Sequence, residues 1–358
     1  MTSFLSFIFV IGVLVFVHEL GHYLAARSVG VRVEKFYLGF NFFNLGLSKT
    51  YKGTEYGLGL FPFGGYVKLA GAIDENMDIS ATGASDELRS KNALEKIWVM
   101  SAGVIMNFLL AIVVFSLSHY SNGEKIIGKE SIVSDVVPNF PAENIGIISN
   151  DRVISIDNVQ FNPLNSWEEM SNYISSNPGK EVEIVWESKG VVKQSIIKID
   201  SYSDLVNYKL VEIGRIGVFP QVSTNEINLL RAFSLGFETT KFWFHKTLGS
   251  FFCLITGEIP LSGLGGPIMI AKVSGQASEI GFGALLNLMA ILSINLGIIN
   301  IMPLPALDGG HVLLSVIEGF RGKELSSQFK LNFQKVGGLL LLFLIIFVVF
   351  NDLTNLSG

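Results

Sequence analysis

The chain has 358 residues, enough for two domains, and its net charge of −5 supplies no basic patch for nucleic acid. The composition is apolar: 49% of the residues are hydrophobic, 16% are charged, and the mean hydropathy is +0.47. Soluble domains carry about 25% charged residues, so this balance favours a membrane protein. The single cysteine, Cys253, excludes an intramolecular disulfide, and we expect it in an apolar core or interface.

Runs without charged residues predict four transmembrane helices. A helix needs about 20 apolar residues to cross a bilayer, and residues 97–123 and 280–307 contain no Asp, Glu, Lys or Arg. Residues 1–17 are also uncharged, so they lack the basic n-region of a signal peptide, and His18, Glu19 and His22 follow where a cleavage region would lie; we therefore expect a retained helix. The fourth run, residues 336–351, is shorter but rich in Leu, Ile, Phe and Val. We therefore predict transmembrane helices at 1–27, 97–119, 280–305 and 336–352.

The basic residues between these spans predict their orientation, because loops rich in Lys and Arg face the cytoplasm. Nine basic residues lie between Arg27 and Lys96, and four lie in the short segment before residue 336. We therefore expect the loops 28–96 and 306–335 on the cytoplasmic side. The long segment between the second and third spans, residues 120–279, is expected outside the cytoplasm.

The extracytoplasmic segment is predicted to hold a small domain at 120–205 and a connector at 206–279. Short β-prone runs separated by turn residues surround one stretch with helical spacing, Trp167–Ile174, so we expect a β-rich module whose helix covers one barrel end. In the connector, Ile227–Gly257 is rich in Phe and Leu but interrupted by charges. This pattern favours an amphipathic helix on the membrane surface over a packed domain helix. The predicted strands are Ile132–Val137, Arg152–Ile156, Val182–Trp186 and Ser195–Ile199.

The first span ends in a metal-binding pattern, His18-Glu19-Leu20-Gly21-His22. Residues four apart share one face of a helix, so both imidazoles can reach one zinc ion, and Glu19 can contact a water molecule beside it. The pattern alone also fits a polar surface stretch. Charged groups at the centre of a membrane, however, cost about 2.5–3.5 kcal/mol each and are candidates for function. We therefore predict that His18 and His22 bind zinc and that Glu19 is the general base.

A catalytic zinc site needs a third protein ligand, and Asp308 is the candidate. It directly follows the uncharged run 280–307, in which Pro303 and Pro305 cannot continue a regular helix. Unwound backbone at membrane depth is tolerated where it lines a cavity, as an active site would provide. An ordinary helix end with a turn also explains the prolines, but it explains less well the polar side chains in or near the same span. These are Asn287, Asn295 and Asn300.

Together these motifs resemble the site-2 protease family of intramembrane zinc metalloproteases, peptidase family M50. The first span carries His18-Glu19-x-x-His22, and the later one carries Asn300-x-x-Pro303-x-Pro305-x-x-Asp308-Gly309. Phe63-Gly64-Gly65-Tyr66-Val67-Lys68 is similar to the membrane-associated β-loop of the bacterial regulator-of-sigma-E protease group, which Gly265-Gly266-Pro267-Ile268 fits as well. The domain at 120–205 is similar to a single PDZ domain.

The resemblance implies an architecture, a cofactor and site residues. The fold would be a multi-pass α-helical membrane protein with about four transmembrane helices, a membrane-associated β-loop and one extracytoplasmic PDZ-like domain. The enzyme would be a zinc metalloendopeptidase of a bacterial inner membrane, with Zn²⁺ toward the cytoplasmic side. Asn300 would hold the substrate backbone or the oxyanion. An unwound substrate would add as a strand to Gly64, Gly65, Tyr66 and Val67, for which a simple Gly-rich turn is the alternative.

The implied partners are the lipid bilayer and transmembrane proteins already cut outside the membrane, such as anti-sigma factors or remnant signal peptides. This activity is regulated intramembrane proteolysis, in which the PDZ-like domain would contact a substrate or a regulator. The alternative function is a non-enzymatic membrane scaffold whose PDZ-like domain binds protein tails, and it predicts no metal. A transporter with an intramembrane ion pathway is a second alternative, but it would need repeat symmetry between broken helices, and the sequence shows none.

Overall fold

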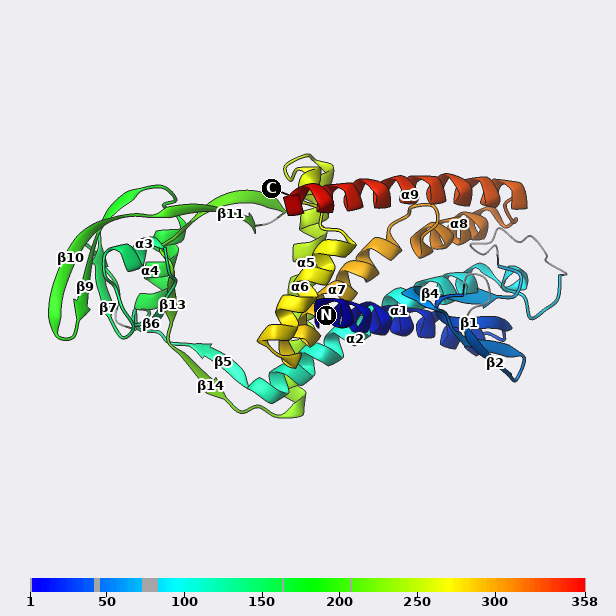
Figure 1. Ribbon diagram of the computed structural model, residues 1–358, viewed down its shortest axis with the longest axis horizontal. Helices are drawn as coiled ribbons and strands as arrows, with labels where there is room; N and C mark the ends of the chain where they lie inside the picture. The colour runs from blue at the N-terminus through cyan, green and yellow to red at the C-terminus, as the bar shows by residue number, and fades with distance from the viewer. Residues whose placement is uncertain (1, 42–45, 73–82, 163, 207, 358) are drawn as a thin grey trace. The chain divides into compact units, whose positions relative to one another are not determined.

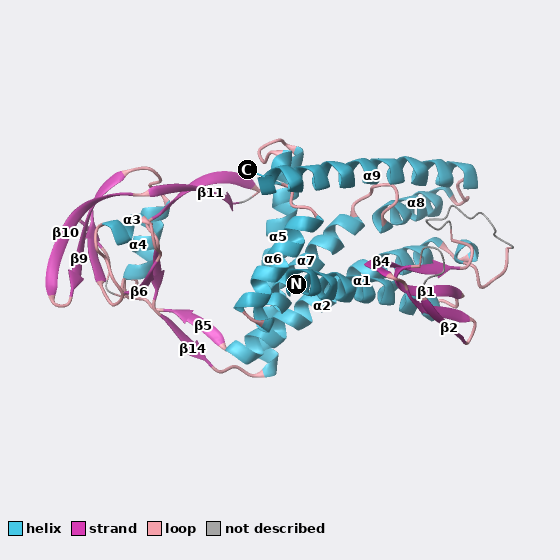
Figure 2. Cartoon of the chain, in the orientation of Figure 1, coloured by secondary structure: helices cyan, strands magenta, loops and turns pink. Residues whose placement is uncertain are grey.

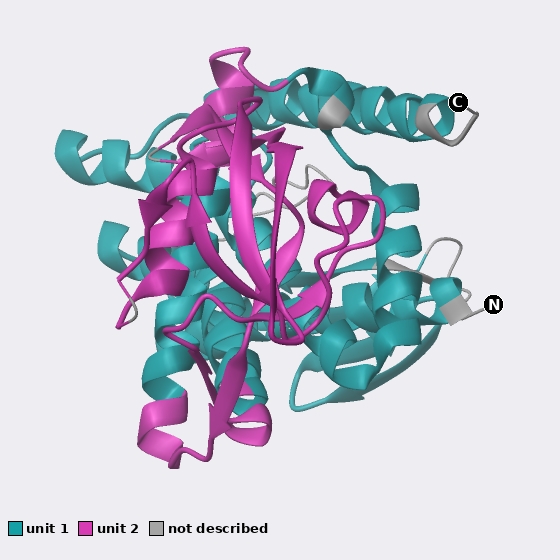
Figure 3. Cartoon of the chain, turned by 90° about the vertical axis from the view of Figure 1, so that its left-hand side faces the viewer, with its two compact units in different colours: residues 1–118, 233–248, 260–358 teal, residues 119–232, 249–259 magenta. Residues whose placement is uncertain are grey.

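The computed structural model describes residues 2–41, 46–72, 83–162, 164–206 and 208–357. They form two compact units, coloured separately in Figure 3. The first unit comprises Met1–Ser118, Phe233–Leu248 and Pro260–Gly358, and the second comprises His119–Ala232 and Gly249–Ile259. The first is mainly helical and the second mainly β-structure (Figure 2). Residues 42–45 and 73–82 of the predicted cytoplasmic loop, residue 163 of the predicted domain and residue 207 of the predicted connector lie outside the described residues.

Among the described residues, four helices are long and apolar enough to cross a membrane, which confirms the four apolar helices predicted from the sequence (Figure 1). The third ends at Ile301 rather than at residue 305, because Pro303 and Pro305 follow and have no N–H to donate. The fourth begins at Ser327, nine residues earlier than predicted, because its first turns carry Lys330 and Lys335 and so fall outside an uncharged run. The helices are α1 (Thr2–Ser28), α2 (Ala93–Asn122), α7 (Phe282–Ile301) and α9 (Ser327–Ser357).

A four-stranded sheet with the order β2-β3-β1-β4 follows α1 in the chain. β1 pairs in parallel with β3 and antiparallel with β4, where Tyr37 lies opposite Tyr66 and their rings stack. β4 lies at one edge of the sheet and packs closely on α1: a Cβ atom added to Gly65 would lie 2.8 Å from Val15 Cγ1. The strands are β1 (Val33–Phe40), β2 (Leu47–Tyr51), β3 (Thr54–Leu58) and β4 (Phe61–Leu69), and the 3-10 helix η2 (Leu88–Ser90) precedes α2.

The segment 306–335, predicted as a loop, instead contains the helix α8 (Asp308–Arg321) and the first turns of α9. Glu318 on α8 is buried and forms ion pairs with Lys330 of α9 at 2.5 Å and Lys96 of α2 at 3.3 Å. The backbone N–H of Leu325 also donates a hydrogen bond of 2.9 Å to the same carboxylate. Glu318 therefore ties α8 to α2 and α9.

The helical stretch predicted at 227–257 is α5 (Leu229–Ile255). In the first unit this helix packs against two of the apolar helices. A Cβ atom added to Gly236 would lie 2.2 Å from Ser116 Oγ of α2, and Thr247 Oγ1 donates a hydrogen bond of 2.7 Å to Asn295 of α7. These contacts agree better with a packed helix than with one that lies only on a membrane surface.

A second helix of the connector, α6 (Pro267–Ile280), starts at the Gly265-Gly266-Pro267-Ile268 motif. The carboxylate of Asp352, near the end of α9, accepts hydrogen bonds from the backbone N–H groups of Gly266 at 2.8 Å and Ile268 at 3.0 Å. The first N–H groups of a helix have no partner within the helix, so Asp352 caps α6. The 3-10 helix η3 (Leu261–Gly263) precedes it.

The second unit is built on a four-stranded sheet with the order β10-β9-β7-β8. Met170 and Ile174 of the helix α4 (Ser166–Ser175) share a buried core with Ile184 and Trp186 of β9. The predicted strands are therefore present in this unit, and the predicted helix is α4, but it is not the lone helix because the short helix α3 (Pro141–Asn144) accompanies it. The strands of the sheet are β7 (Arg152–Ile156), β8 (Val159–Gln160), β9 (Glu181–Ser188) and β10 (Val191–Lys198).

The second unit extends beyond the predicted domain boundary at residue 205. Two short strands of the predicted connector, β13 and β14, pair with the first two strands of the second unit: β13 pairs with β6, and β14 pairs with β5. Such pairing joins segments far apart in the sequence, so local patterns do not reveal it. The remaining strands are β5 (Glu124–Ile127), β6 (Val133–Val136), β11 (Asp200–Val206), β12 (Lys209–Arg215), β13 (Val218–Pro220) and β14 (Val222–Asn225).

Candidate metal centre

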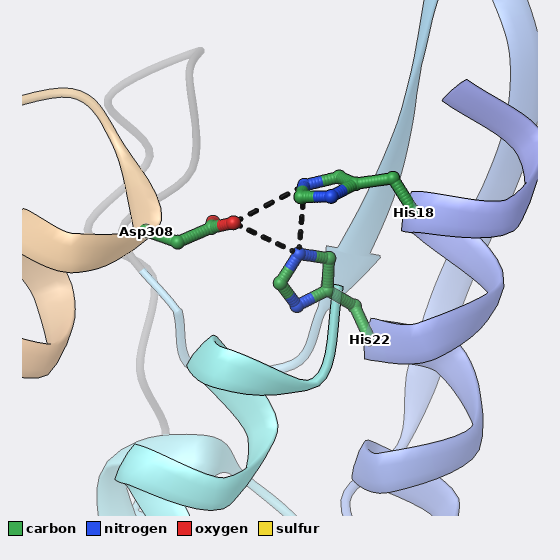
Figure 4. A group of neighbouring side chains, drawn as sticks. All are labelled: His18, His22 and Asp308. Carbon is green, nitrogen blue, oxygen red and sulfur yellow. Dashed lines mark hydrogen bonds and ion pairs between the residues drawn. The ribbon is translucent and has the colours of Figure 1, made fainter. Parts of the chain in front are cut away.

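His18 and His22 lie one turn apart on α1, and both face Asp308 (Figure 4). Their Nε2 atoms are 3.2 Å apart. Asp308 Oδ2 lies 3.1 Å from the Nε2 atom of His18 and 3.3 Å from that of His22. Both histidines are 7% exposed, and among the described residues Asp308 Oδ2 has no hydrogen-bond partner of acceptable geometry. Three buried ligand atoms, two imidazole nitrogens and one carboxylate oxygen, therefore converge on one point.

This triangle has the dimensions of a zinc site. Tetrahedral zinc with ligand bonds of about 2.0 Å holds its ligand atoms about 3.3 Å apart, and the three distances here are 3.2, 3.1 and 3.3 Å. Burial opposes ionisation of Asp308, but the His22 and His18 imidazoles hold the pKa of its carboxyl well below its usual range. The donor set is thus two imidazoles and a carboxylate, which suits Zn²⁺ and leaves a fourth position for water or substrate.

Asp308 reaches the histidines because the chain breaks between α7 and α8. Ala306, in the linking segment, has a φ of 68°, in the left-handed region that alanine rarely adopts. Gly309 then lets the start of α8 pack tightly on the end of α7, since an added Cβ atom would lie 2.2 Å from the carbonyl oxygens of Ile301 and Met302. Asp308 is therefore the first residue of a helix, where the sequence predicted a loop.

The helix α2 forms another side of the site, a contribution that the sequence did not predict. His22 Nδ1 donates a hydrogen bond of 2.8 Å to the carbonyl oxygen of Val99, which turns Nε2 toward Asp308. Gly103 makes this approach possible, because an added Cβ atom would lie 2.4 Å from His22 Nε2. Every residue has a backbone carbonyl, so the sequence cannot indicate which one accepts this hydrogen bond. The available signals were Gly103 and the polar Asn107 within the uncharged run 97–123.

A cavity of about 750 Å³ joins these side chains to the edge strand β4. Glu19 faces it, and the backbone N–H of Val67 on β4 donates to the Glu19 carboxylate. Asn300 Nδ2 lies 3.3 Å from His18 Nε2. The structure brings together all the predicted site residues, which line this cavity: His18, Glu19, His22, Gly64, Gly65, Tyr66, Val67, Asn300 and Asp308.

The other two asparagines of the third span lie away from this cavity lining. Asn295 accepts the hydrogen bond from Thr247 of α5, and Asn287 is half-buried, with a buried Oδ1 atom that has no hydrogen-bond partner among the described residues. Of the three polar side chains noted in that span, Asn300 is the one that lines the cavity.

The chain is similar to proteins named as zinc metalloproteases over nearly its whole length. The model of Peptidase family M50 matches residues 6–344. A Campylobacter jejuni protein whose name marks it as a zinc metalloprotease is 33% identical over 365 residues, which cover 99% of this chain and 94% of that protein. An Agrobacterium fabrum protein named in the same way is 32% identical over 367 residues, with 98% and 96% covered. The PDZ domain of an SdrC-like protein from Listeria monocytogenes covers 26% of this chain and 90% of its own, at 22% identity and a TM-score of 0.21.

The chain belongs to peptidase family M50, as its motifs predicted. It is a zinc metalloprotease, and its four apolar helices agree with a membrane location. This result decides against the non-enzymatic scaffold, which predicts no metal. The interpretation of the second unit as PDZ-like stays a prediction.

Proposed function

We propose that this protease cleaves peptide bonds within or near transmembrane segments, with zinc held by His18, His22 and Asp308 and with Glu19 as the general base. The observation that carries the proposal is the buried triangle of ligand atoms, 3.1 to 3.3 Å apart. Two of the three ligands lie in α1, a helix apolar enough to cross a membrane. A substrate would therefore meet the metal at membrane depth.

When bound, zinc would polarise the peptide carbonyl and lower the pKa of a water molecule toward about 7. Glu19 is adjacent to His18 in sequence, yet its carboxylate faces the cavity and is not one of the three converging ligands. This carboxylate takes a proton from the water as the water oxygen attacks the carbonyl carbon. It then gives the proton to the amide nitrogen as the C–N bond breaks, leaving a carboxyl and an amino terminus.

The edge of β4 is the proposed binding site for the substrate backbone. Peptides add to sheet edges through main-chain hydrogen bonds, and the cavity is lined by Gly64, Gly65, Tyr66 and Val67 of this strand. A Cβ atom added to Gly65 would lie 3.6 Å from Glu19 Cγ, so an extended segment along this edge passes beside the base. The substrate helix must unwind first, because its own hydrogen bonds occupy the peptide carbonyls.

Asn300 is the proposed contact for the substrate carbonyl. Its amide lies 3.3 Å from the Nε2 atom of His18, which places it beside the metal ligands and inside the same cavity. An N–H donor in this position can stabilise the oxyanion that forms when the carbonyl is attacked. The same donor can instead hold the substrate backbone before the reaction.

The proposed substrates are membrane proteins already cut on the extracytoplasmic side, such as anti-sigma factors or remnant signal peptides. An earlier cut removes the bulky domain that would keep a transmembrane segment from entering a buried cavity. The proposed location is a bacterial inner membrane, with the metal centre toward the cytoplasm. The second unit, as an extracytoplasmic PDZ-like domain, would contact the substrate or a regulator.

The Glu19→Gln variant tests the assigned base. Glutamine keeps the size of the side chain but cannot accept the proton, so the purified variant should retain zinc and lose cleavage of a model transmembrane substrate in vesicles. Unchanged cleavage would remove Glu19 from its role.

The Asp308→Ala variant tests the third ligand. Its zinc content, measured by elemental analysis after dialysis, should fall well below that of the wild type. Asp352→Ala removes a buried carboxylate remote from the cavity lining and is the control. Full zinc occupancy in Asp308→Ala would exclude Asp308 from the metal site.

A further inference from the structure

One face of α2 meets both histidines at positions four residues apart. The carbonyl oxygen of Val99 accepts from His22 Nδ1, Gly103 lies against both rings, and the side chain of Asn107 reaches His18. Asn107 is fully buried, at 0% exposure. Its amide nitrogen lies 3.1 Å from His18 Nδ1, and its Oδ1 atom has no hydrogen-bond partner among the described residues. A buried amide with an unsatisfied oxygen costs free energy, so its place beside His18 calls for a physical reason.

The reason lies in the tautomer that a zinc ligand needs. His18 points Nε2 at Asp308 Oδ2 and at His22 Nε2, so Nε2 is the atom that would bind the metal. A neutral imidazole that binds through Nε2 carries its proton on Nδ1, and this N–H needs an acceptor. The amide nitrogen of Asn107 cannot accept, whereas its oxygen can. A half-turn of the carboxamide exchanges the two atoms with almost no change in shape.

We propose that Asn107 is a positioning residue for the metal centre: its Oδ1 atom accepts the Nδ1–H of His18 and so presents the Nε2 lone pair of that imidazole to zinc. The inference rests on the proposed function of His18 as a ligand. The carbonyl oxygen of Val99 accepts the Nδ1–H of His22 in the same way. The helix α2 therefore orients both imidazoles, one through its backbone and one through a side chain. Ser293 Oγ of α7 donates to the carbonyl oxygen of Asn107 at 2.8 Å, which fixes α2 at this turn.

Two substitutions at Asn107 separate hydrogen bonding from packing. Asn107→Leu keeps a similar size but offers no acceptor, and loss of such a partner typically weakens metal binding 10- to 100-fold. Asn107→Asp restores an oxygen acceptor facing His18 and should bind zinc within a few-fold of the wild type. Asn287→Leu is the matched control, since it removes another asparagine with a buried, unbonded Oδ1 atom on an apolar helix away from the cavity lining.

The measurement is zinc affinity of the full-length, detergent-solubilised chain by competition with a chromophoric chelator. Thermal unfolding of the metal-free variants is recorded in parallel. The expected result is weak zinc binding by Asn107→Leu, near-normal binding by Asn107→Asp and by Asn287→Leu, and similar melting of the metal-free proteins. Cobalt substitution adds a second readout, because a displaced His18 changes the ligand-field absorption.

The outcomes distinguish this inference from the proposed function. If the wild type binds one zinc that His18→Ala loses, yet Asn107→Leu binds it as tightly as the wild type, the role of Asn107 is wrong and the metal site stands. If the wild type and His18→Ala bind zinc equally, the proposed site itself is wrong. If Asn107→Leu does not fold, Asn107→Asp decides, because zinc loss in that folded variant contradicts an acceptor role.

Discussion

Gly103 of α2 lies against both imidazoles of the candidate metal centre. Its missing side chain leaves room for His22 Nε2 and His18 Cε1, which would lie 2.4 and 2.7 Å from an added Cβ atom. On α1, Gly21 likewise leaves room for α2, because an added Cβ atom would lie 2.5 Å from the carbonyl oxygen of Ala102. Small residues let helices approach closely inside membranes. Here the close approach also lets α2 contact the histidines.

The Gly103→Ala substitution is expected to weaken zinc binding while the chain still folds. The added methyl group must push the imidazole ends aside, and overpacking of this kind costs about 1–3 kcal/mol. If this free-energy cost falls entirely on the zinc-bound state, zinc affinity decreases roughly 5- to 150-fold. Chelator competition on the solubilised protein measures it. Gly12→Ala on α1 is the control, because no described residue outside the local backbone of α1 comes within 4 Å of its added Cβ atom, and equal affinity of both variants would contradict the steric argument.

At the scale of elements, α8 is positioned by the buried carboxylate of Glu318. Burial raises the pKa of this group, but Lys330, the backbone N–H of Leu325 and Lys96 outweigh it and hold the pKa below its usual value. The ionised carboxylate joins α8 to the start of α2 and the start of α9. Since Asp308 is the first residue of α8, the same anchor holds the third ligand in place.

Glu318→Gln should lower the stability of the first unit by about 2 kcal/mol, the usual worth of a hydrogen bond to a charged group. For a unit of this size that is a fall of roughly 4–8 °C in the melting temperature. Thermal unfolding of the solubilised chain with chelator present measures the effect without the metal. Glu279→Gln, which alters an exposed carboxylate on α6, should leave the melting temperature unchanged. Equal melting of Glu318→Gln and the wild type would show that the ion pairs do not stabilise α8.

The elements that the sequence predicted are those with local signals. Uncharged runs located the four apolar helices, and the spacing of His18 and His22 set both rings on one helical face. The sequence did not predict α8, because its polar and charged residues resemble a loop when only uncharged runs are sought. It also missed the pairing of β13 and β14 with β6 and β5, which depends on contacts between distant segments.

The same division holds inside the candidate site. Asp308 stood out because it follows a broken apolar run, so its place in the sequence carried the prediction. The carbonyl of Val99 carries no side-chain signal at all, and Asn107 becomes meaningful only when α2 is seen beside His18. Contacts that orient ligands are set by how helices pack, and packing is a property of the whole unit.

At the scale of the whole molecule, the candidate metal centre and the β-rich module belong to different units of the chain. All the residues that line the cavity belong to the first unit, and the second has its own buried core. In that second unit the turn after β7 places Asp157 and Asn158 at φ values of 48° and 62°, which Asp and Asn tolerate well. The Asp157 carboxylate accepts hydrogen bonds from Lys180 Nζ at 2.7 Å and from the backbone N–H of Glu183 at 2.9 Å.

This carboxylate predicts how the second unit responds to acid. Lys180, the N–H of Glu183 and the hydroxyl of Tyr173 lower the pKa of Asp157 to about 2, below its ordinary value of 3.8. A group with a depressed folded pKa stabilises the fold above its unfolded pKa and loses that contribution as the pH falls through the folded one. The stabilisation by Asp157 is therefore complete above about pH 4 and disappears between pH 4 and 2.

Asp157→Asn should lower the protection of the β7 and β9 amides at pH 6, and the difference from the wild type should shrink steadily below pH 4. Hydrogen exchange of the full chain, corrected for the pH dependence of chemical exchange, measures both effects. Glu181→Gln, an exposed carboxylate at the start of β9, is the control and should match the wild type. Zinc affinity at pH 7 should be the same in all three proteins, because the ligands lie in the other unit. A pH-independent difference would exclude the titration of Asp157 as its cause, and a loss of zinc would contradict the separation of the two units.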